Sequence, residues 1–139
     1  MGTSTDNKAA VRNLFESASH GDFEAAGAIV TTDYVLHPEE VRGADGLREM
    51  VEAYRAAIAG LNVTIDQQFT EGDHVATRFT IRGTHDGELM GVPPSGRDVE
   101  FTGITISRCR EGRIEEEWEI VDTVALLRQI GALPEMARG

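Results

Sequence analysis

The chain has 139 residues, of which 40% are hydrophobic and 27% are charged, and this composition is ordinary for one globular domain spanning residues 1–139. Thirteen Lys and Arg residues against 24 Asp and Glu residues give a net charge of −11, which argues against binding to nucleic acid or to an anionic membrane. The sequence shows neither an apolar run of membrane-spanning length nor a signal-peptide pattern, so we expect a cytoplasmic protein.

Apolar residues recur at helical spacing in the first half of the chain. They predict a helix that begins at Thr5 or Asp6 and a shorter one that begins at Asp22, because Thr and Asp are good N-cap residues. Residues 32–36 read as a short strand. The clearest helix covers residues 43–60, where Gly60 is typical of a helix C-terminus.

The second half alternates between apolar and polar residues, which predicts strands over residues 62–70, 74–84, 99–110 and 113–122. Short turn sequences at residues 71–73 and 111–112 predict antiparallel hairpins. Residues 86–98 form a long loop, of a kind that often acts as a lid, and residues 124–130 read as a last short helix. Helices followed by a curved antiparallel sheet indicate an α+β fold.

Strand alternation predicts which side chains of the last strand face inward. Glu115, Glu117 and Glu119 share one face and need water, so the opposite face, with Trp118 and Asp122, is expected to be inside. A two-residue turn at 111–112 places Phe101 opposite Asp122, and Arg108 opposite Glu115 on the outside.

The same register leaves Ile104 and Ile106 on the outer face of the sheet. Two exposed isoleucines suggest a contact with a second subunit, and a homodimer is therefore expected. Scattered surface apolar residues are the alternative, and the sequence leaves the two open.

Asp122 is the most informative polar residue, because a carboxylate that continues an apolar inward face has a raised pKa and suits acid/base chemistry. It can equally serve as the N-cap of the last helix. His37 and His85 are candidates to bind a substrate oxygen, although an exposed loop position and a packing role explain them as well. Histidine spacing indicates no metal site, and the single cysteine, Cys109, excludes a cysteine-based zinc site.

Several segments together resemble the SnoaL-like polyketide cyclase family, over about Asn7 to Pro134. They are Gly83-Thr84-His85-Asp86-Gly87-Glu88, Gly91-Val92-Pro93-Pro94-Ser95-Gly96-Arg97, and Gly112-Arg113-Ile114-Glu115-Glu116-Glu117-Trp118 followed by Asp122. The resemblance implies a cone-shaped curved sheet around a pocket closed by N-terminal helices. It also implies cofactor-free intramolecular aldol ring closure of an aromatic polyketide, with Asp122 as the acid/base residue.

The expected substrate is a hydrophobic small molecule, held in a pocket whose lining is predicted to include Phe15, Tyr34, Met50, Tyr54, Phe79, Met90, Phe101, Thr105 and Trp118. Neither a metal nor a cofactor is expected. Two alternatives remain open: another small-molecule isomerase or epoxide hydrolase on the same fold, and a non-catalytic module for binding apolar ligands or for dimerisation.

Overall fold

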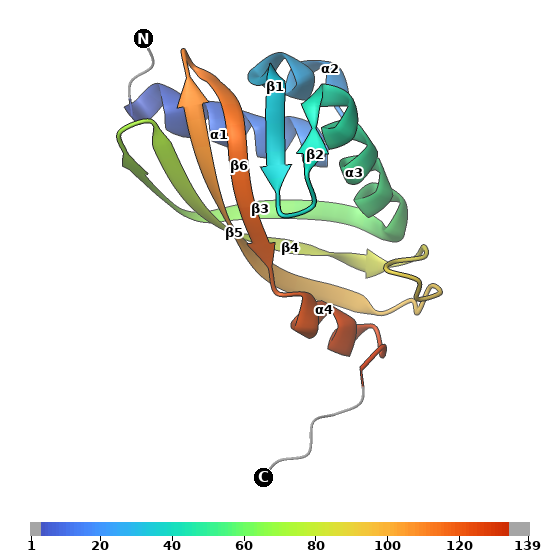
Figure 1. Ribbon diagram of the computed structural model, residues 1–139. Helices are drawn as coiled ribbons and strands as arrows, with labels where there is room; N and C mark the ends of the chain where they lie inside the picture. Colours follow the sequence, from blue (N-terminus) through green and yellow to red (C-terminus); the bar gives the residue numbers. More distant parts are fainter. Residues whose placement is uncertain (1–3, 134–139) are drawn as a thin grey trace.

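The computed structural model describes residues 4–133 (Figure 1). In chain order the elements are α1 (Ser4–Ser19), α2 (Phe23–Ile29), β1 (Val30–His37), β2 (Val41–Arg42), α3 (Gly43–Ala57), β3 (Ile58–Glu71), β4 (His74–His85), β5 (Asp98–Arg110), β6 (Arg113–Val121) and α4 (Thr123–Gln129). The six strands form one open curved sheet in the order β2-β1-β6-β5-β4-β3. Neighbouring strands are antiparallel except β1 and β6, which are parallel. The expected α+β class is confirmed, as are the two hairpins predicted from the turns at residues 71–73 and 111–112.

Capping chemistry explains where the two short helices begin. Asp22 precedes α2, and its carboxylate accepts a hydrogen bond from the Ala25 backbone N–H at 3.1 Å. Asp122 precedes α4 and accepts from the Ala125 backbone N–H at 3.0 Å in the same way. Each carboxylate satisfies an N–H group that the first helical turn leaves without a partner, so these starts can be predicted from local sequence.

Helix α3 ends at Ala57, three residues earlier than the sequence predicts. The chain passes directly into β3, where Ile58 is paired with His85 of β4. Gly60 does have a positive φ of 67°, but it lies in an irregular stretch of β3 between Ala59 and Asn62 instead of capping the helix. Pairing of β3 with β4 therefore ends the helix before it reaches Gly60, the residue expected at its C-terminus.

The hairpin of β5 and β6 contains one extra residue, and this decides which side chains enter the interior. Next to the turn Cys109 is paired with Ile114, as predicted, but Arg108 is paired with Glu116, which leaves Glu115 without a partner in the ladder. The unpaired carboxylate forms ion pairs with Arg108 at 2.9 Å and with Arg110 at 2.7 Å. Such a bulge shifts the alternation of the strand by one residue.

The predicted faces of β6 are consequently wrong. Glu117 and Glu119 face the interior, whereas Trp118 and Ile120 lie outside with 38% and 77% exposure. On β5 the prediction holds, because Ile104 and Ile106 are exposed and Thr105 is buried. The homodimer expected from the two isoleucines stays a prediction.

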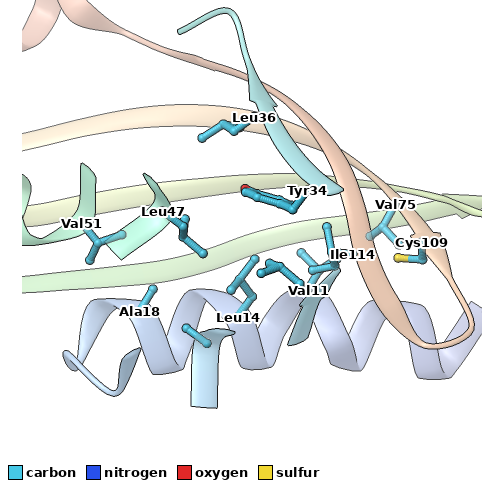
Figure 2. Packing of buried hydrophobic residues seen from close by; sticks show 12 residues of the cluster. Val11, Leu14, Ala18, Tyr34, Leu36, Leu47, Val51, Val75, Cys109 and Ile114 are labelled. Atoms are coloured by element: carbon cyan, nitrogen blue, oxygen red, sulfur yellow. The ribbon is translucent and has the colours of Figure 1, made fainter. Parts of the chain in front are cut away.

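The concave side of the sheet is covered by α1 and α3, while α4 packs at the far end against β5 (Figure 1). Figure 2 shows the larger apolar cluster, in which Val11 and Leu14 of α1 pack near Tyr34 of β1 and Ile114 of β6. A second cluster, including Phe101, Leu126 and Ile130, lies under α4. None of the helices in residues 4–133 is both long and apolar enough to cross a membrane.

Candidate functional site

An apolar cavity of about 90 Å³ lies between the helices α1 and α3 and the concave face of the sheet. It adjoins a cleft of about 370 Å³, with which it shares Met50, Tyr54, Glu119 and Val121. The predicted lining residues Phe15, Tyr34, Met50, Tyr54 and Phe79 all contribute to the cavity wall. Their convergence follows from the apolar stripes of the two helices and from strand alternation, both of which are local patterns.

Glu117 is one of two carboxylates on the cavity wall, and it is only 3% exposed. The Tyr34 hydroxyl donates to its Oε1 at 2.6 Å, and the Ser107 hydroxyl donates to its Oε2 at 2.5 Å. Burial raises the pKa of Glu117, although the two hydroxyl donors oppose the shift. The side chain is thus held by a hydroxyl on each oxygen.

Glu119 lies two residues further along β6 and lines both the cavity and the cleft. The Thr105 hydroxyl donates to its Oε1 at 2.8 Å. Burial, followed by the negative charge of Glu117, raises the pKa of Glu119 to about 7. A carboxyl group with that pKa exchanges protons readily at neutral pH, which suits a general acid or base.

The two tyrosines of the cavity are held in their neutral form. Burial raises the pKa of Tyr34, and the neighbouring Glu117 raises it further. Burial also raises the pKa of Tyr54, with Glu119 and Glu39 as additional causes. Both phenols consequently remain hydrogen-bond donors at any pH near neutrality.

Asp122 is not inside the cavity. Its side chain is exposed, and its carboxylate caps α4, so the expected inward position is wrong and the capping alternative is confirmed. The cause is the bulge at Glu115, which turns Glu119 and Val121 inward in place of Ile120 and Asp122. A catalytic role for Asp122 stays a prediction of the family resemblance.

His37 lies on the outer side of the sheet rather than at the mouth of the cavity. Its Nε2 is 2.7 Å from Glu116 Oε2, and its ring stacks on Trp118 with centroids 5.7 Å apart. Glu116 also forms an ion pair with Arg108 at 2.7 Å. The His37 ring is therefore engaged by partners on the outer face.

His85 is fully buried, but beside the second apolar cluster and not in the cavity. The Ser95 backbone N–H donates to its Nδ1 at 3.2 Å, and the Ser95 hydroxyl lies 2.8 Å from the same atom. An N–H group can only donate, so Nδ1 accepts and the ring proton is on Nε2. His85 thereby fixes the loop of residues 86–97, whose Leu89 also packs into the second cluster.

The remaining predicted lining residues separate into three environments. Phe101 belongs to the second cluster, and Met90 is 50% exposed on the loop, while Trp118 is on the outer face. Thr105 reaches the site indirectly, through its hydrogen bond to Glu119. Within residues 4–133, no cluster of three or more His, Cys, Asp or Glu side chains is placed to hold a metal ion.

Sequence reasoning missed Glu117 and Glu119 because a run of glutamates on a strand is normally solvated. A signal was present on the facing strand, where Thr105 and Ser107 alternate inward among apolar residues. Buried hydroxyls need polar partners, and the glutamates at positions 117 and 119 are those partners.

A curved sheet, an apolar cavity roofed by helices, and carboxylates inside it define an α+β protein with an internal apolar pocket. The sequence profile of the SnoaL-like polyketide cyclases matches residues 8–130, and the chain belongs to this family. Aklanonic acid methyl ester cyclase DnrD from Streptomyces peucetius is 24% identical over 134 residues, which cover 87% of this chain and 88% of DnrD.

Two solved structures show the same architecture over nearly the whole chain. TsrD from Streptomyces laurentii is 25% identical, with a TM-score of 0.88 over 96% of this chain and 100% of TsrD. IdmH from Streptomyces antibioticus, a candidate polyketide cyclase, is 34% identical, with a TM-score of 0.78 over 90% of this chain and 98% of IdmH.

Proposed function

We propose that this protein is a cofactor-independent cyclase that closes a ring of an aromatic polyketide-type molecule by an intramolecular aldol reaction, with Glu119 as the acid/base residue. Membership of the polyketide cyclase family and the name of the relative DnrD support this reaction class. The observation that carries the proposal is the position of Glu119, a carboxyl group with a pKa of about 7 on the wall of an apolar cavity.

The chemistry needs one group that first accepts and then returns a proton. The Glu119 carboxylate removes a proton from the carbon between two carbonyl groups, and the resulting enolate carbon attacks the carbon of a third carbonyl group in the same molecule. A carbon–carbon bond forms, and the new alkoxide oxygen takes the proton back from Glu119. The protein also has to hold the two carbons close together, which is the contribution of the apolar cavity walls.

The proposed site includes the cleft beside Glu119, because an aromatic polyketide of three rings needs more room than the cavity of about 90 Å³ alone. One end of the ring system enters between α1, α3 and the sheet, and the rest lies in the cleft near Tyr54 and Met50. This arrangement places the centre of the molecule at Glu119, where the cavity and the cleft meet.

A mass-spectrometric turnover assay with a tricyclic anthracycline-type methyl ester tests the proposal. Glu119→Gln is expected to lower turnover at least 100-fold, since positioned acid/base groups contribute roughly 10²–10⁴-fold. Glu49→Gln, on the exposed face of α3, is the matched control and is expected to retain turnover.

Asp122→Asn separates the two candidate carboxylates. If Asp122→Asn abolishes turnover and Glu119→Gln does not, the family-derived role of Asp122 holds and the proposal for Glu119 is wrong. If the wild type binds the ester without converting it, the protein is a binding module and the cyclase proposal fails.

A further inference from the structure

We propose that Tyr34 and Glu117 form a subsite that binds the enol, enolate or phenol oxygen of a ring ligand in the cavity. This inference rests on the proposed function, because it names the group that would hold the oxygen on which negative charge develops. In the proposed closure Tyr34 touches that oxygen, and Glu117 acts through Tyr34 as a positioning residue.

The pair is built from two strands that meet only in the folded protein. Tyr34 on β1 is 1% exposed and Glu117 on β6 is 3% exposed, and both side chains line the cavity. Their contact of 2.6 Å joins residues 83 positions apart in the sequence. Parallel pairing of β1 with β6 brings them together, with Leu36 of β1 beside Glu117 in the ladder.

The hydrogen bonds show how the Tyr34 hydroxyl can become available to donate to a ligand. With Glu117 ionised, the hydroxyl hydrogens of Tyr34 and Ser107 are both directed at its carboxylate oxygens. Burial favours the protonated form of Glu117. A protonated Glu117 donates to the Tyr34 oxygen, which frees the Tyr34 hydrogen to bind a ligand oxygen, while Ser107 keeps its bond to the other carboxyl oxygen.

The electrostatic surroundings determine which kind of oxygen this subsite prefers. Apart from Glu117, which is protonated in this state of the subsite, the charges that shift the pKa values of Tyr34, Tyr54 and Glu119 are the carboxylates of Glu119 and Glu39. An oxygen that develops negative charge next to them needs donors that are already aligned. A phenol backed by a carboxylic acid supplies such a donor without a cation, and it favours an enolic oxygen over an apolar group of the same shape.

A matched pair of small probes tests the subsite without any turnover. The probes 4-fluorophenol and 4-fluorotoluene differ only in a hydroxyl against a methyl group, and ¹⁹F NMR titration gives the dissociation constant of each. The wild type is expected to bind the phenol several-fold more tightly than the toluene. Tyr34→Phe is expected to lose that preference, because it removes the hydroxyl that donates to the phenol oxygen, and a hydrogen bond between neutral groups is worth up to roughly 10-fold.

Further variants isolate the pair. Glu49→Gln, on the exposed face of α3, is the control and is expected to leave the phenol-to-toluene ratio unchanged. Glu117→Leu is expected to lower the ratio, since leucine cannot donate to the Tyr34 oxygen, whereas Glu117→Gln is expected to keep it, because the amide N–H donates in place of the protonated acid. Ser107→Ala removes only the second partner of Glu117 and is expected to lower the phenol-to-toluene ratio by a smaller amount. It serves as the test if a thermal melt shows that Tyr34→Phe is not folded.

Equal affinities of the wild type for the two probes, or an unchanged ratio in folded Tyr34→Phe, would overturn the subsite. The binding result is independent of catalysis, so the two proposals fail separately. Phenol selectivity without ring closure leaves the subsite standing and removes the cyclase assignment. Ring closure that depends on Glu119, without phenol selectivity, supports the cyclase assignment and overturns the subsite.

Discussion

Replacing Glu119 by glutamine is expected to change the pH dependence of stability in a defined direction. The pKa of this carboxyl rises from its ordinary value of 4.5 to about 7 on folding. Between those pH values the unfolded chain releases the proton and the folded chain keeps it, so stability falls as pH rises. Below pH 4.5 Glu119 is protonated in both the folded and the unfolded chain. Above pH 7 it is ionised in both, and the loss of unfolding free energy is complete.

The size of the effect follows from the shift. A change from 4.5 to about 7 corresponds to about 3 kcal/mol at 1.36 kcal/mol per pKa unit. Glutamine has nearly the same shape, still accepts from Thr105, and does not ionise. Relative to the wild type, Glu119→Gln should therefore gain about 3 kcal/mol of unfolding free energy between pH 4.5 and pH 8.

Urea unfolding at a series of pH values from 4.5 to 8 measures this difference. Glu49→Gln is the control, because its side chain is exposed on α3, and its stability curve should run parallel to that of the wild type. A parallel curve for Glu119→Gln as well would refute the reasoning. It would mean that the Glu119 carboxyl is hydrated in the folded protein and has an ordinary pKa.

Three other changes test the local structure. Asp122→Ala should cost about 1 kcal/mol in urea unfolding and Asp122→Asn much less, because asparagine is also a good N-cap; equal losses would contradict the capping role. Gly87→Ala should lower the melting temperature strongly, since a Cβ there would lie 2.2 Å from the Ala56 carbonyl oxygen; a wild-type melt would show that the backbone can move. Deleting Glu115 should leave the Glu119 pKa near 7 in a ¹³C NMR titration, because the extra residue has no ladder partner, and a return to an ordinary value would contradict the bulge argument.

The features that sequence predicts well depend on neighbours along the chain. Asp22 and Asp122 are N-caps because their carboxylates bond an N–H three residues further on. Phe15 and Tyr54 reach the cavity because they lie on the apolar stripes of α1 and α3, and Phe79 because strand alternation directs it inward. These patterns act within a few residues, and distant packing has not overridden them.

The features that sequence does not predict depend on contacts between distant segments. His85 is buried as alternation requires, yet it lies outside the cavity, beside Ile58 of the second cluster, because β4 extends beyond the cavity to meet the loop at Ser95. The parallel pairing of β1 with β6 joins residues about 80 positions apart and leaves no local pattern in either strand. Without that pairing, Tyr34 could not be recognised as the partner of Glu117.

The bulge at Glu115 links the error in the predicted site to the chemistry of the observed one. A regular hairpin would expose Glu117 and Glu119 and bury Trp118, which is the arrangement that hydrophobicity alone favours. The protein instead exposes Trp118 and buries Glu117, and it offsets part of the burial cost with the hydroxyls of Tyr34 and Ser107. An arrangement that is unfavourable for a simple core but fully hydrogen-bonded is typical of a functional site, where local preferences yield to chemistry. The same reasoning gives the two glutamates different tasks. Glu117 is enclosed by two hydroxyl donors and positions Tyr34, whereas Glu119 also lines the cleft and exchanges the proton.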